Sequence, residues 1–527
     1  MIGLSGVLYE VSYFILVFLL ISSNLFSVAY LPLQPLFLLM GVKQRFFSPS
    51  RGIRQGDPLS PYLFILCMEF RGALIHSKCE EGAWTRLRAS RWGPGFFHIF
   101  FVDDLLLFAK ANFKNCDAIS EVLQTFCTTS GQKISNVKSR VFFSPTVPNS
   151  TRNGICHKLG VFMTSSLGKY LGFPIIHSGK TRNDFQFVVE RVQAKLDGWK
   201  SKLLSPAGRL VLIKSAALPI SDYVMQCVAL PTKIYSSVDK LCRDFLWGST
   251  LEKRKLHLVN WSKVTLPTDI GGLGIFQMKH RNSALLAKLC WRIATDKDKP
   301  WAQILIKKYL TPSRLSHRGK HRPCSKIWAG CKKGGVIFNK GIRWKIHNGN
   351  SVGFWNDFWL TSGPLRAHIQ GPLTTSEESL LLSDVSSGNS WNFGLLSFDF
   401  PFNLLQEIRA TPFSTSSSME DTIIWGFSSD GDFSLKSAYY LAKGLNPLNL
   451  VTNNAWIWKV MTSPWIKFFL WLCSHSSVPT YEVLGSRGLS IDSLCPICGL
   501  QSESIIHMLR DCYVVKIFLD ETWYSGL

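Results

Sequence analysis

The chain has 527 residues, of which 46% are hydrophobic and 18% are charged, and this composition excludes a wholly disordered protein. The 59 Lys and Arg residues outnumber the 35 Asp and Glu residues, which gives a net charge of +24. This charge indicates an anionic partner, either nucleic acid or a membrane surface. The 14 cysteines are too dilute for a disulfide scaffold, and most stand alone, which is typical of thiols in a reducing compartment. We therefore favour an intracellular location, nuclear or cytoplasmic.

Residues 1–40 are largely apolar and contain no Lys or Arg. The run from Val11 to Ile21 is shorter than the roughly 20 residues that span a bilayer. Two prolines, Pro32 and Pro35, interrupt the second run, and the basic region of a secretory signal is absent. The segment has three interpretations: a predicted transmembrane segment within residues 11–40, which we do not favour, buried core, or a segment that lacks its proper partners.

The remaining chain divides into four predicted regions after the apolar segment 1–41. Gly and Pro turns between short apolar runs predict an α/β domain over residues 42–180. Residues 181–300 are predicted to be helical, because apolar residues recur at a spacing near 3.6 in Phe185–Leu196 and Asn282–Ala294. Residues 301–445 form a connection region, and residues 446–527 form a small aromatic-rich module. The Gly271–Gly274 segment lacks the strand and acid of a dinucleotide site, so a turn is predicted there.

Two adjacent acids, Asp103 and Asp104, lie between apolar runs whose residue types are typical of strands. The pattern predicts a hairpin that carries both acids at its tip. Two like charges are costly on an apolar hairpin unless a cation neutralises them, and Mg²⁺ prefers carboxylate oxygen. An exposed polar turn is the alternative, and from these two residues alone both interpretations are about equally supported.

The upstream segment Arg51–Pro61, with the sequence RGIRQGDPLSP, favours the first interpretation. Gly52 and Gly56 allow the backbone to approach a ligand closely. The arginines, including Arg54, supply positive charge for phosphate, and Pro61 stands where a helix can start. The combination predicts a site for an anion such as a triphosphate or a nucleic-acid strand. An ordinary basic turn explains each feature singly but explains the whole set poorly.

These motifs resemble the palm of reverse transcriptases, most closely those of plant non-LTR (LINE-type) retroelements. The residues that carry the resemblance are Gly52-x-x-Gln55-Gly56-x-x-x-Ser60-Pro61 and Phe101-Val102-Asp103-Asp104. The similarity extends from about residue 42 to the C-terminal end, through Ser130–Ser139, Lys169–Gly172 (which resembles the primer grip), residues 199–291 and Trp344–Leu360. It implies an α+β fold with a partial polymerase palm, a helical thumb-like and connection region, and a small C-terminal zinc-binding helical module.

The resemblance implies RNA-directed DNA synthesis from an RNA template and a DNA primer, with dNTP substrates and two Mg²⁺ ions. Asp103 is the implied magnesium ligand, and Asp104 supports it. Lys138 is the implied general acid for the pyrophosphate. The implied nucleotide-binding and template-binding residues are Arg54, Gln55, Gly56 and Phe101.

The family pattern also requires a third carboxylate on a strand before the Gln-Gly loop. No Asp precedes Asp57, and Glu10 is the only acid upstream of it; the surroundings of Glu10 do not resemble the family motif. We therefore expect a truncated sequence, without the fingers and the first palm strand, and an inactive polymerase, because a charged clamp on the phosphates contributes about 10³–10⁵ in rate. The alternatives are a non-catalytic nucleic-acid-binding remnant and a protein anchored to a membrane by residues 1–40.

Four candidate metal ligands lie near the C-terminal end: Cys495, Cys498, His507 and Cys512. Three thiolates and one imidazole suit tetrahedral Zn²⁺. If Glu503–Leu509 is a helix, His507 faces the CxxC pair, whereas Cys512 lies off that face of an ideal helix, so the helix is predicted to end or bend near residue 511. A redox CxxC is the alternative, but it would need neither His507 nor Cys512. Residues 446–527 resemble the zinc-binding domain that follows plant retroelement polymerases.

Overall fold

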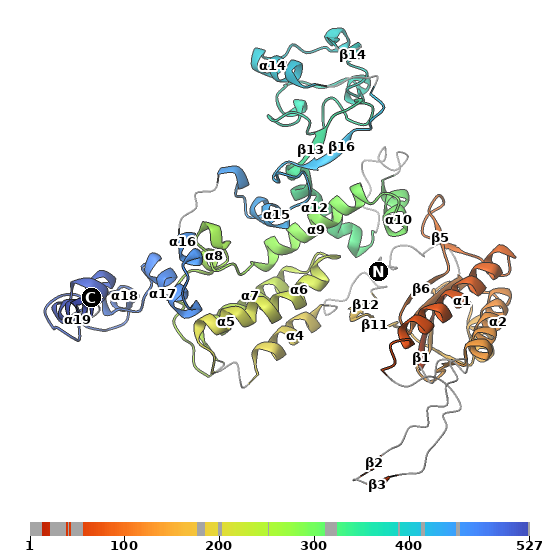
Figure 1. The fold of residues 1–527 in the computed structure, drawn as a ribbon. Coiled ribbons are helices and arrows are strands. Elements are labelled where there is room, and N and C mark those ends of the chain that lie inside the picture. Colours follow the sequence, from red (N-terminus) through yellow and green to blue (C-terminus); the bar gives the residue numbers. More distant parts are fainter. Residues whose placement is uncertain are drawn as a thin grey trace. The chain divides into compact units, whose positions relative to one another are not determined.

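The computed structural model describes residues 13–21, 38–39, 42–43, 56–175, 185–198, 203–250, 252–310, 324–387, 390–412, 417–449 and 454–524 (Figure 1). Contacts along the chain divide it into two units. The first unit consists of Met1–Thr181 and Asp296–Lys326, and the second consists of Arg182–Thr295 and Ile327–Leu527. The described part mixes helices with small sheets, which confirms the predicted α+β class.

A six-stranded sheet forms the centre of the first unit, with the order β10-β9-β1-β7-β6 and with β8 paired to β1. Its strands are β1 (Tyr13–Ile21), β6 (His98–Phe101), β7 (Asp104–Lys110), β8 (Lys133–Ile134), β9 (Arg140–Phe143) and β10 (Phe162–Met163). Every pair is antiparallel except that of β9 with β10. Strand β1 pairs with β7 from Tyr13 opposite Lys110 to Leu19 opposite Asp104. Strand β7 therefore lies between β1 and β6, inside the sheet.

One face of β7 packs against helices. Leu105, Leu107 and Ala109 belong to a buried core that includes residues of three helices: α1 (Ser60–Glu80), α2 (Phe113–Ser130) and α3 (Asn149–Leu159). The other face packs against two short hairpins, because Leu106 and Phe108 form a second core with Leu87 and Tyr170. The hairpin strands are β4 (Leu87–Arg88), β5 (Gly95–Phe96), β11 (Lys169–Tyr170) and β12 (Phe173–Pro174). Burial on both faces explains the continuous apolar run after Asp104, since such a strand needs no polar alternation.

The helix that follows the Gln-Gly loop begins where the sequence indicates. Helix α1 starts at Ser60 and carries Pro61 in its first turn, where the missing N–H of proline costs no helical hydrogen bond. Asp57 Oδ1 accepts a hydrogen bond from the Leu59 N–H at 2.8 Å. The predicted helix start at Pro61 is thus confirmed. The first unit also contains the pair β2 (Leu38–Leu39) and β3 (Val42–Lys43) and helix α10 (Pro300–Tyr309).

Helices dominate the first part of the second unit: α4 (Gln186–Leu196), α5 (Pro206–Leu212), η3 (Ile213–Ala217), α6 (Leu218–Met225), α7 (Thr232–Trp247), α8 (Trp261–Val264), η4 (Thr268–Ile270) and α9 (Met278–Thr295). Both helices predicted from apolar spacing are present, as α4 and α9. Buried Asn282 links α9 to the connection between α6 and α7. Its Oδ1 accepts the Leu230 N–H at 3.0 Å, and its Nδ2 donates to the Met225 and Val228 carbonyls.

Helix α12 (Lys326–Gly341) packs closely on α9 because it has glycines at the contact. A Cβ atom at Gly334 would lie 2.4 Å from the Leu286 carbonyl carbon, and a Cβ at Gly330 would lie 3.0 Å from the Leu286 side chain. The chain continues into β13 (Ile342–Lys345), which pairs antiparallel with β16 (Thr422–Trp425). Buried Trp425 donates its indole N–H to the hydroxyl of Ser437 in α15 (Leu435–Ala442) at 2.7 Å.

An aromatic core lies between β13 and β16 in the sequence. It includes Phe354, Trp355, Trp359 and Phe400, and their rings pack at centroid distances of 5.0–6.2 Å. The elements around it are η5 (Leu365–Ala367), α13 (Thr375–Glu378), β14 (Ser386–Ser387), β15 (Ser390–Trp391), η6 (Phe393–Leu395) and α14 (Phe402–Ala410). This core accounts for the tryptophan-rich composition of the region.

The C-terminal part of the second unit is helical: η7 (Pro447–Asn449), α16 (Trp456–Lys459), α17 (Pro464–Ser474), α18 (Tyr481–Ser486), η8 (His507–Asp511) and α19 (Tyr513–Tyr524). Buried Trp471 of α17 donates its indole N–H to the Gly271 carbonyl at 2.8 Å. This hydrogen bond connects the C-terminal helices to the predicted Gly271–Gly274 turn within the same unit.

The N-terminal apolar segment lies mostly outside the described residues. Its described parts are Tyr13–Ile21, which is strand β1 of the sheet, and Leu38–Leu39, which is strand β2. Within the ranges that the structure describes, no helix combines the length and the apolar character needed to cross a membrane.

Candidate functional sites: the acidic hairpin and the cysteine–histidine cluster

The predicted acidic hairpin is formed by β6 and β7. The two strands pair from His98 opposite Leu107 to Phe101 opposite Asp104, so Val102 and Asp103 form a two-residue connection. Val102 has a φ of 52°, which is a strained conformation for a β-branched residue. Phe101 and Val102 are each 56% exposed. The hairpin therefore presents its turn to solvent while Leu105–Ala109 of β7 stay buried.

The two acids occupy different environments. Asp103 is exposed in the turn, whereas Asp104 is half-buried at the first position of β7. Burial raises the pKa of Asp104, and the negative charge of Asp103 raises it further. Each of the two causes disfavours the ionised form of Asp104. A divalent cation would remove both penalties.

Tyr170 interacts electrostatically with Asp104. Burial raises the pKa of Tyr170, and the charge of Asp104 adds to the shift. The Tyr170 hydroxyl is buried and has no hydrogen-bond partner among the described residues. Tyr170 belongs to the segment that resembles the primer grip, which forms the hairpin β11–β12 through Leu171 and Gly172, both with positive φ. Tyr170 was not among the predicted site residues, although that resemblance could have indicated it.

The other predicted site residues of the first unit are placed only in part. Gly56 has a φ of 90°, a backbone conformation that favours glycine, and a Cβ there would meet no atom of the described residues within 4 Å. Arg54 and Gln55 lie outside the described residues. Lys138 is exposed in the bend between β8 and β9, where its N–H donates to the Ser135 carbonyl at 3.2 Å. No contact that the structure describes joins Lys138 to the acids.

The strand beside the acids offers no carboxylate. Strand β1 has the sequence YFILVFLLI, and its Leu19 is the register partner of Asp104. Among the residues that the structure describes, no third His, Cys, Asp or Glu joins Asp103 and Asp104 in a metal-binding group. Two carboxylates can ligate one hard cation, but they fit a two-metal site poorly, since such a site needs ligands shared between the metals.

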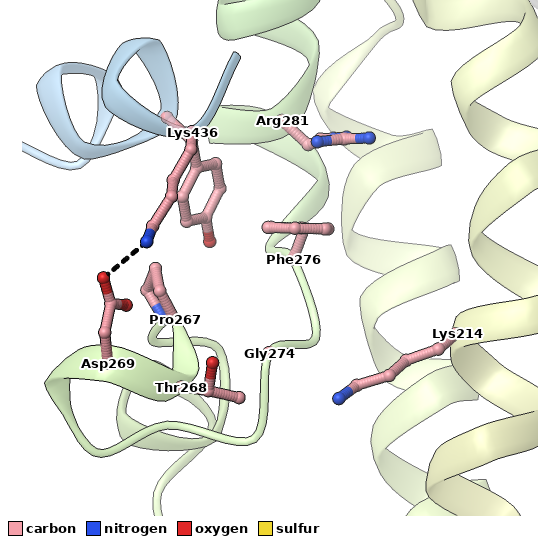
Figure 2. A pocket seen from close by; sticks show the side chains of 9 residues that line it. Lys214, Pro267, Thr268, Asp269, Gly274, Phe276, Arg281 and Lys436 are labelled. Carbon is pink, nitrogen blue, oxygen red and sulfur yellow. Dashed lines mark ion pairs between the residues drawn. The ribbon is translucent and has the colours of Figure 1, made fainter. Parts of the chain in front are cut away.

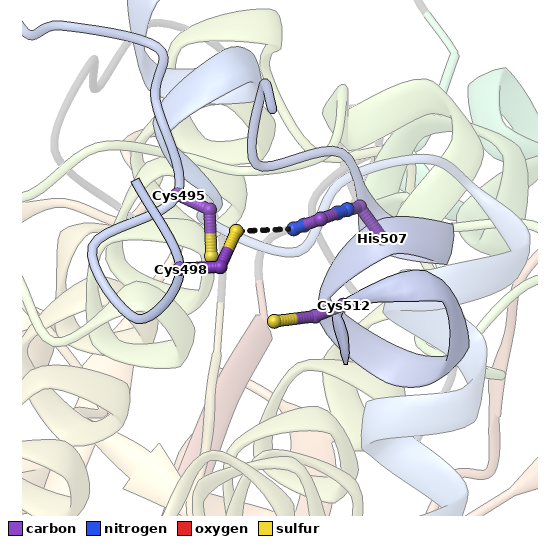
Figure 3. A group of neighbouring side chains, drawn as sticks. All are labelled: Cys495, Cys498, His507 and Cys512. Carbon is purple, nitrogen blue, oxygen red and sulfur yellow. Dashed lines mark hydrogen bonds between the residues drawn. The ribbon is translucent and has the colours of Figure 1, made fainter. Parts of the chain in front are cut away.

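The cysteine–histidine cluster brings together all four predicted ligands (Figure 3). The donor atoms of Cys495, Cys498, His507 and Cys512 lie within 4.8 Å of one another. Cys498 Sγ and His507 Nε2 are 3.3 Å apart, close to the roughly 3.5 Å expected between two ligands of a tetrahedral Zn²⁺ site. Three of the four side chains are buried, and Cys498 is half-buried. The number, type and spacing of the donors therefore fit zinc.

Two local structures produce this convergence. Around the CxxC pair, the Cys495 N–H donates to the Gln501 carbonyl and the Gly499 N–H donates to the Cys495 carbonyl, both at 2.8 Å. Gly499 has a φ of 65°, which allows the tight turn. On the other side, His507–Asp511 forms a π-helical turn in which the Cys512 N–H donates to the His507 carbonyl at 2.9 Å.

The π-helical turn resolves the spacing problem that the sequence posed. A helix with i to i+5 hydrogen bonds brings residues five apart onto one face, so Cys512 joins His507 there. The helix then ends at Cys512, whose ψ of 127° is extended. The predicted end of the helix near residue 511 is thus present, and the wider turn is the feature that sequence spacing did not specify.

The cluster favours a thiolate at Cys498, whereas the pKa of its neighbour Cys495 is raised. The backbone N–H of Leu500 lowers the pKa of Cys498, and the Gln501 N–H, His507 and Cys495 contribute to a final value of about 6. Amide donors to sulfur stabilise the ionised form, which is the form that binds metal. All 14 cysteines are free thiols. A redox function of the CxxC pair does not explain why His507 and Cys512 are buried beside that pair. Zinc binding explains this burial, because both residues would be ligands.

Two family models match the chain in this order. Residues 20–175 match a family described as reverse transcriptase (RNA-dependent DNA polymerase). Residues 433–518 match a family described as zinc-binding in reverse transcriptase. The first match covers the acidic hairpin and the Gln-Gly loop, and the second covers all four residues of the cysteine–histidine cluster.

Three relatives are similar to this chain in sequence. A protein of Arabidopsis thaliana described as a ribonuclease H protein is 34% identical over 348 residues, which are 64% of this chain and 56% of that protein. An uncharacterized mitochondrial protein of the same plant is 48% identical over 69 residues, 13% of this chain and 57% of the relative. A retrovirus-related Pol polyprotein from a type-2 retrotransposable element of Drosophila melanogaster is 27% identical over 251 residues, 44% of this chain and 21% of the relative.

The two matched segments belong to reverse transcriptase families, and they lie on a fold of mixed helix and sheet that carries the cysteine–histidine cluster. The chain is a reverse transcriptase-like protein of retroelement origin, and the predicted resemblance is confirmed. It spans little more than half the length of the first two of these relatives. The predicted Zn²⁺ is supported by both the family match and the ligand geometry.

Proposed function

We propose that this chain binds nucleic acid as a reverse transcriptase-like protein and does not itself catalyse RNA-directed DNA synthesis. One observation carries the proposal: strand β1, which lies beside the acidic hairpin, contains no acid and pairs Leu19 with Asp104. Mg²⁺, when bound in this family, activates the primer 3′-hydroxyl and neutralises the triphosphate. In this chain Asp103 and Asp104 are the residues that would hold it.

The remaining parts of the proposed site concern binding rather than chemistry. The net charge of +24 favours a polyanionic partner. Four residues are proposed to contact template or nucleotide: Arg54, Gln55 and Gly56 in the loop before α1, and the exposed Phe101. The zinc cluster is proposed to hold the C-terminal module in shape, with Cys495, Cys498, His507 and Cys512 as its ligands, since a structural Zn²⁺ site contributes folding free energy directly.

The test is primer extension from a 5′-labelled DNA primer on an RNA template with dNTPs, in Mg²⁺ and separately in Mn²⁺. We expect no extension by the wild-type chain or by Asp103→Asn, while both bind the same primer–template in a fluorescence anisotropy titration. Extension by the wild type that Asp103→Asn abolishes would refute inactivity. Failure of the wild type to bind the primer–template would refute the binding function.

A further inference from the structure

A cavity of about 390 Å³ lies within the second unit (Figure 2). Three segments that are distant in the sequence line it: Lys214 of η3, the loop that contains Thr268 and Gly274, and Lys436 of α15. Arg281 of α9 completes the cationic lining. The loop is the glycine-rich segment that the sequence predicted as a turn, and none of the functions above uses it.

Two of the three cations are already balanced by acids. Arg281 donates to both carboxylate oxygens of Asp222, with a shortest distance of 2.6 Å. Lys436 Nζ lies 2.7 Å from Asp269 Oδ2. Lys214, in contrast, has no hydrogen bond or ion pair among the residues that the structure describes. The cavity therefore carries one uncompensated positive charge.

Partial burial of Lys214 in the cavity costs hydration of its ammonium group. Burial lowers the pKa of Lys214, because an ammonium group in a partly desolvated site loses hydration. Lys214 lies in a π-helical turn directly before α6, whose first turn contains Pro219. Proline cannot donate a helical hydrogen bond and clashes with the preceding turn, which explains the widened helix. Single π-helical turns of this kind are frequent at functional sites.

The glycine-rich loop makes room for the amine. Figure 2 shows Lys214 extending toward Gly274 and Thr268. A Cβ atom on Gly274 would lie 3.2 Å from Lys214 Nζ and 3.1 Å from Thr268 Cγ2, and the φ of Gly274 is 69°. A side chain at 274 would therefore crowd the end of the lysine. Thr268 lines the same cavity, and its hydroxyl is a group that can donate a hydrogen bond.

We propose that this cavity binds a phosphate group, with Lys214 as the charged contact and the Thr268 hydroxyl as a second donor. The loop amides cannot provide the contact, because the N–H groups of residues 271–274 all donate to carbonyls of residues 264–268. Recognition therefore depends on side chains and suits a single tetrahedral anion. The phosphate can come from a nucleic-acid backbone, which rests on the proposed function, or from a free phosphate.

The test compares Lys214→Met with Lys332→Met in the full chain. The Met side chain keeps the aliphatic stem of Lys214. Lys332 is an exposed lysine of α12, so Lys332→Met removes the same charge at a position outside the cavity. Binding of a fluorescein-labelled 20-nucleotide single-stranded RNA is measured between 50 and 200 mM KCl, and the melting temperature is measured with and without inorganic phosphate. The variant Lys214→Arg, which keeps the charge, serves as a rescue.

If the source is a nucleic-acid backbone, Lys214→Met weakens RNA binding on the order of tenfold and lowers the salt slope by about 0.7, while Lys332→Met does neither. If the source is free phosphate, inorganic phosphate raises the melting temperature of the wild type and of Lys214→Arg but not of Lys214→Met. Equal behaviour of the two Met variants in both arms would overturn the phosphate site. If the wild type and Lys214→Met bind RNA equally well and inorganic phosphate does not raise the melting temperature of the wild type, the phosphate site is refuted. The proposed nucleic-acid binding function is not refuted by that result.

Discussion

Arg71 is a buried charged residue that is expected to lower the stability of the fold. Its side chain is fully buried in α1, and none of its three guanidinium nitrogens has a hydrogen-bond partner among the described residues. The rings of Phe100 and Phe126 lie 5.1 and 5.3 Å from its guanidinium carbon. Burial lowers the pKa of Arg71 to about 10. Cation–π contacts offset only part of the desolvation of a buried charge.

We expect Arg71→Met to stabilise the protein. Methionine fills a similar volume with apolar atoms, so the free energy of unfolding in urea should rise by about 1–4 kcal/mol. Arg88→Met removes an exposed arginine from β4 and should change it by less than about 0.5 kcal/mol. A destabilised Arg71→Met would show that the guanidinium has a compensating partner.

The raised pKa of Asp104 gives a second prediction at the residue scale. Because the folded state holds its proton more tightly than the unfolded state, stability falls as pH rises above the ordinary carboxyl value of 3.8 toward the raised value. Without divalent cations, Asp104→Asn should therefore become more stable than the wild type across this window and remain so at pH 7. Melting curves from pH 3 to 7 in EDTA measure this. Asp197→Asn, which removes an exposed carboxylate outside the hairpin, is measured alongside as the control. A wild type that gains stability over the window relative to Asp104→Asn would contradict the expectation.

Helix packing at the element scale depends on glycines that local propensity would not favour. Helix α12 contains adjacent glycines, Gly334 and Gly335, in its interior. Only the first meets α9, since a Cβ at Gly334 would lie 2.4 Å from the Leu286 backbone whereas a Cβ at Gly335 would meet nothing within 4 Å. The close approach of the two helices therefore requires glycine at one position and not at its neighbour.

We expect opposite effects from two alanine substitutions in α12. Gly334→Ala should lower the free energy of unfolding by roughly 1–3 kcal/mol, because the backbones of α9 and α12 must separate. Gly335→Ala should raise it by up to about 1 kcal/mol, because alanine is the better helix former in open space. Urea unfolding of both variants checks the pair. Equal effects would mean that the helices do not pack at Gly334.

The zinc module depends on contact between the turn that carries Cys495 and Cys498 and the π-helical turn that begins at His507. We expect Cys498→Ser to lose bound zinc and the hydrogen-exchange protection of residues 493–512, since a structural metal site is coupled to folding. Cys473→Ser removes a thiol outside the cluster and should retain both. Zinc content by elemental mass spectrometry and exchange by mass spectrometry are the measurements. Full zinc content in Cys498→Ser would exclude this ligand set.

At the scale of the whole molecule, charge rather than shape sets the expected behaviour toward nucleic acid. The excess of 59 basic over 35 acidic residues is large enough to make binding depend mainly on counterion release. About six phosphate contacts on single-stranded RNA would give a slope of about −4 when log K is plotted against log salt concentration. Fluorescence anisotropy between 50 and 200 mM KCl measures the slope, with an uncharged peptide nucleic acid of the same sequence as control. A slope near zero would exclude this mode of binding.

Local sequence patterns predicted much of both sites. The acids Asp103 and Asp104 are adjacent in the chain, and apolar strands on either side of them specify a hairpin. The CxxC pair and the two later ligands lie within 18 residues of one another, so their chemistry could be predicted before their geometry. The π-helical turn at His507 could not be predicted, because i to i+5 hydrogen bonding has no strong signature in residue type. The burial of Arg71 could not be predicted either, since arginine is rarely fully buried.

By itself, the sequence determined which donor residues the two sites contain and the family that the chain resembles, because each donor set lies in a short segment and the motifs follow one another in a fixed order. Only the tertiary structure decided that Leu19 stands opposite Asp104 and that Lys214, Gly274 and Lys436 line one cavity. Strand register and the meeting of segments more than 150 residues apart depend on how buried surfaces pack, and no local pattern of residues encodes that outcome.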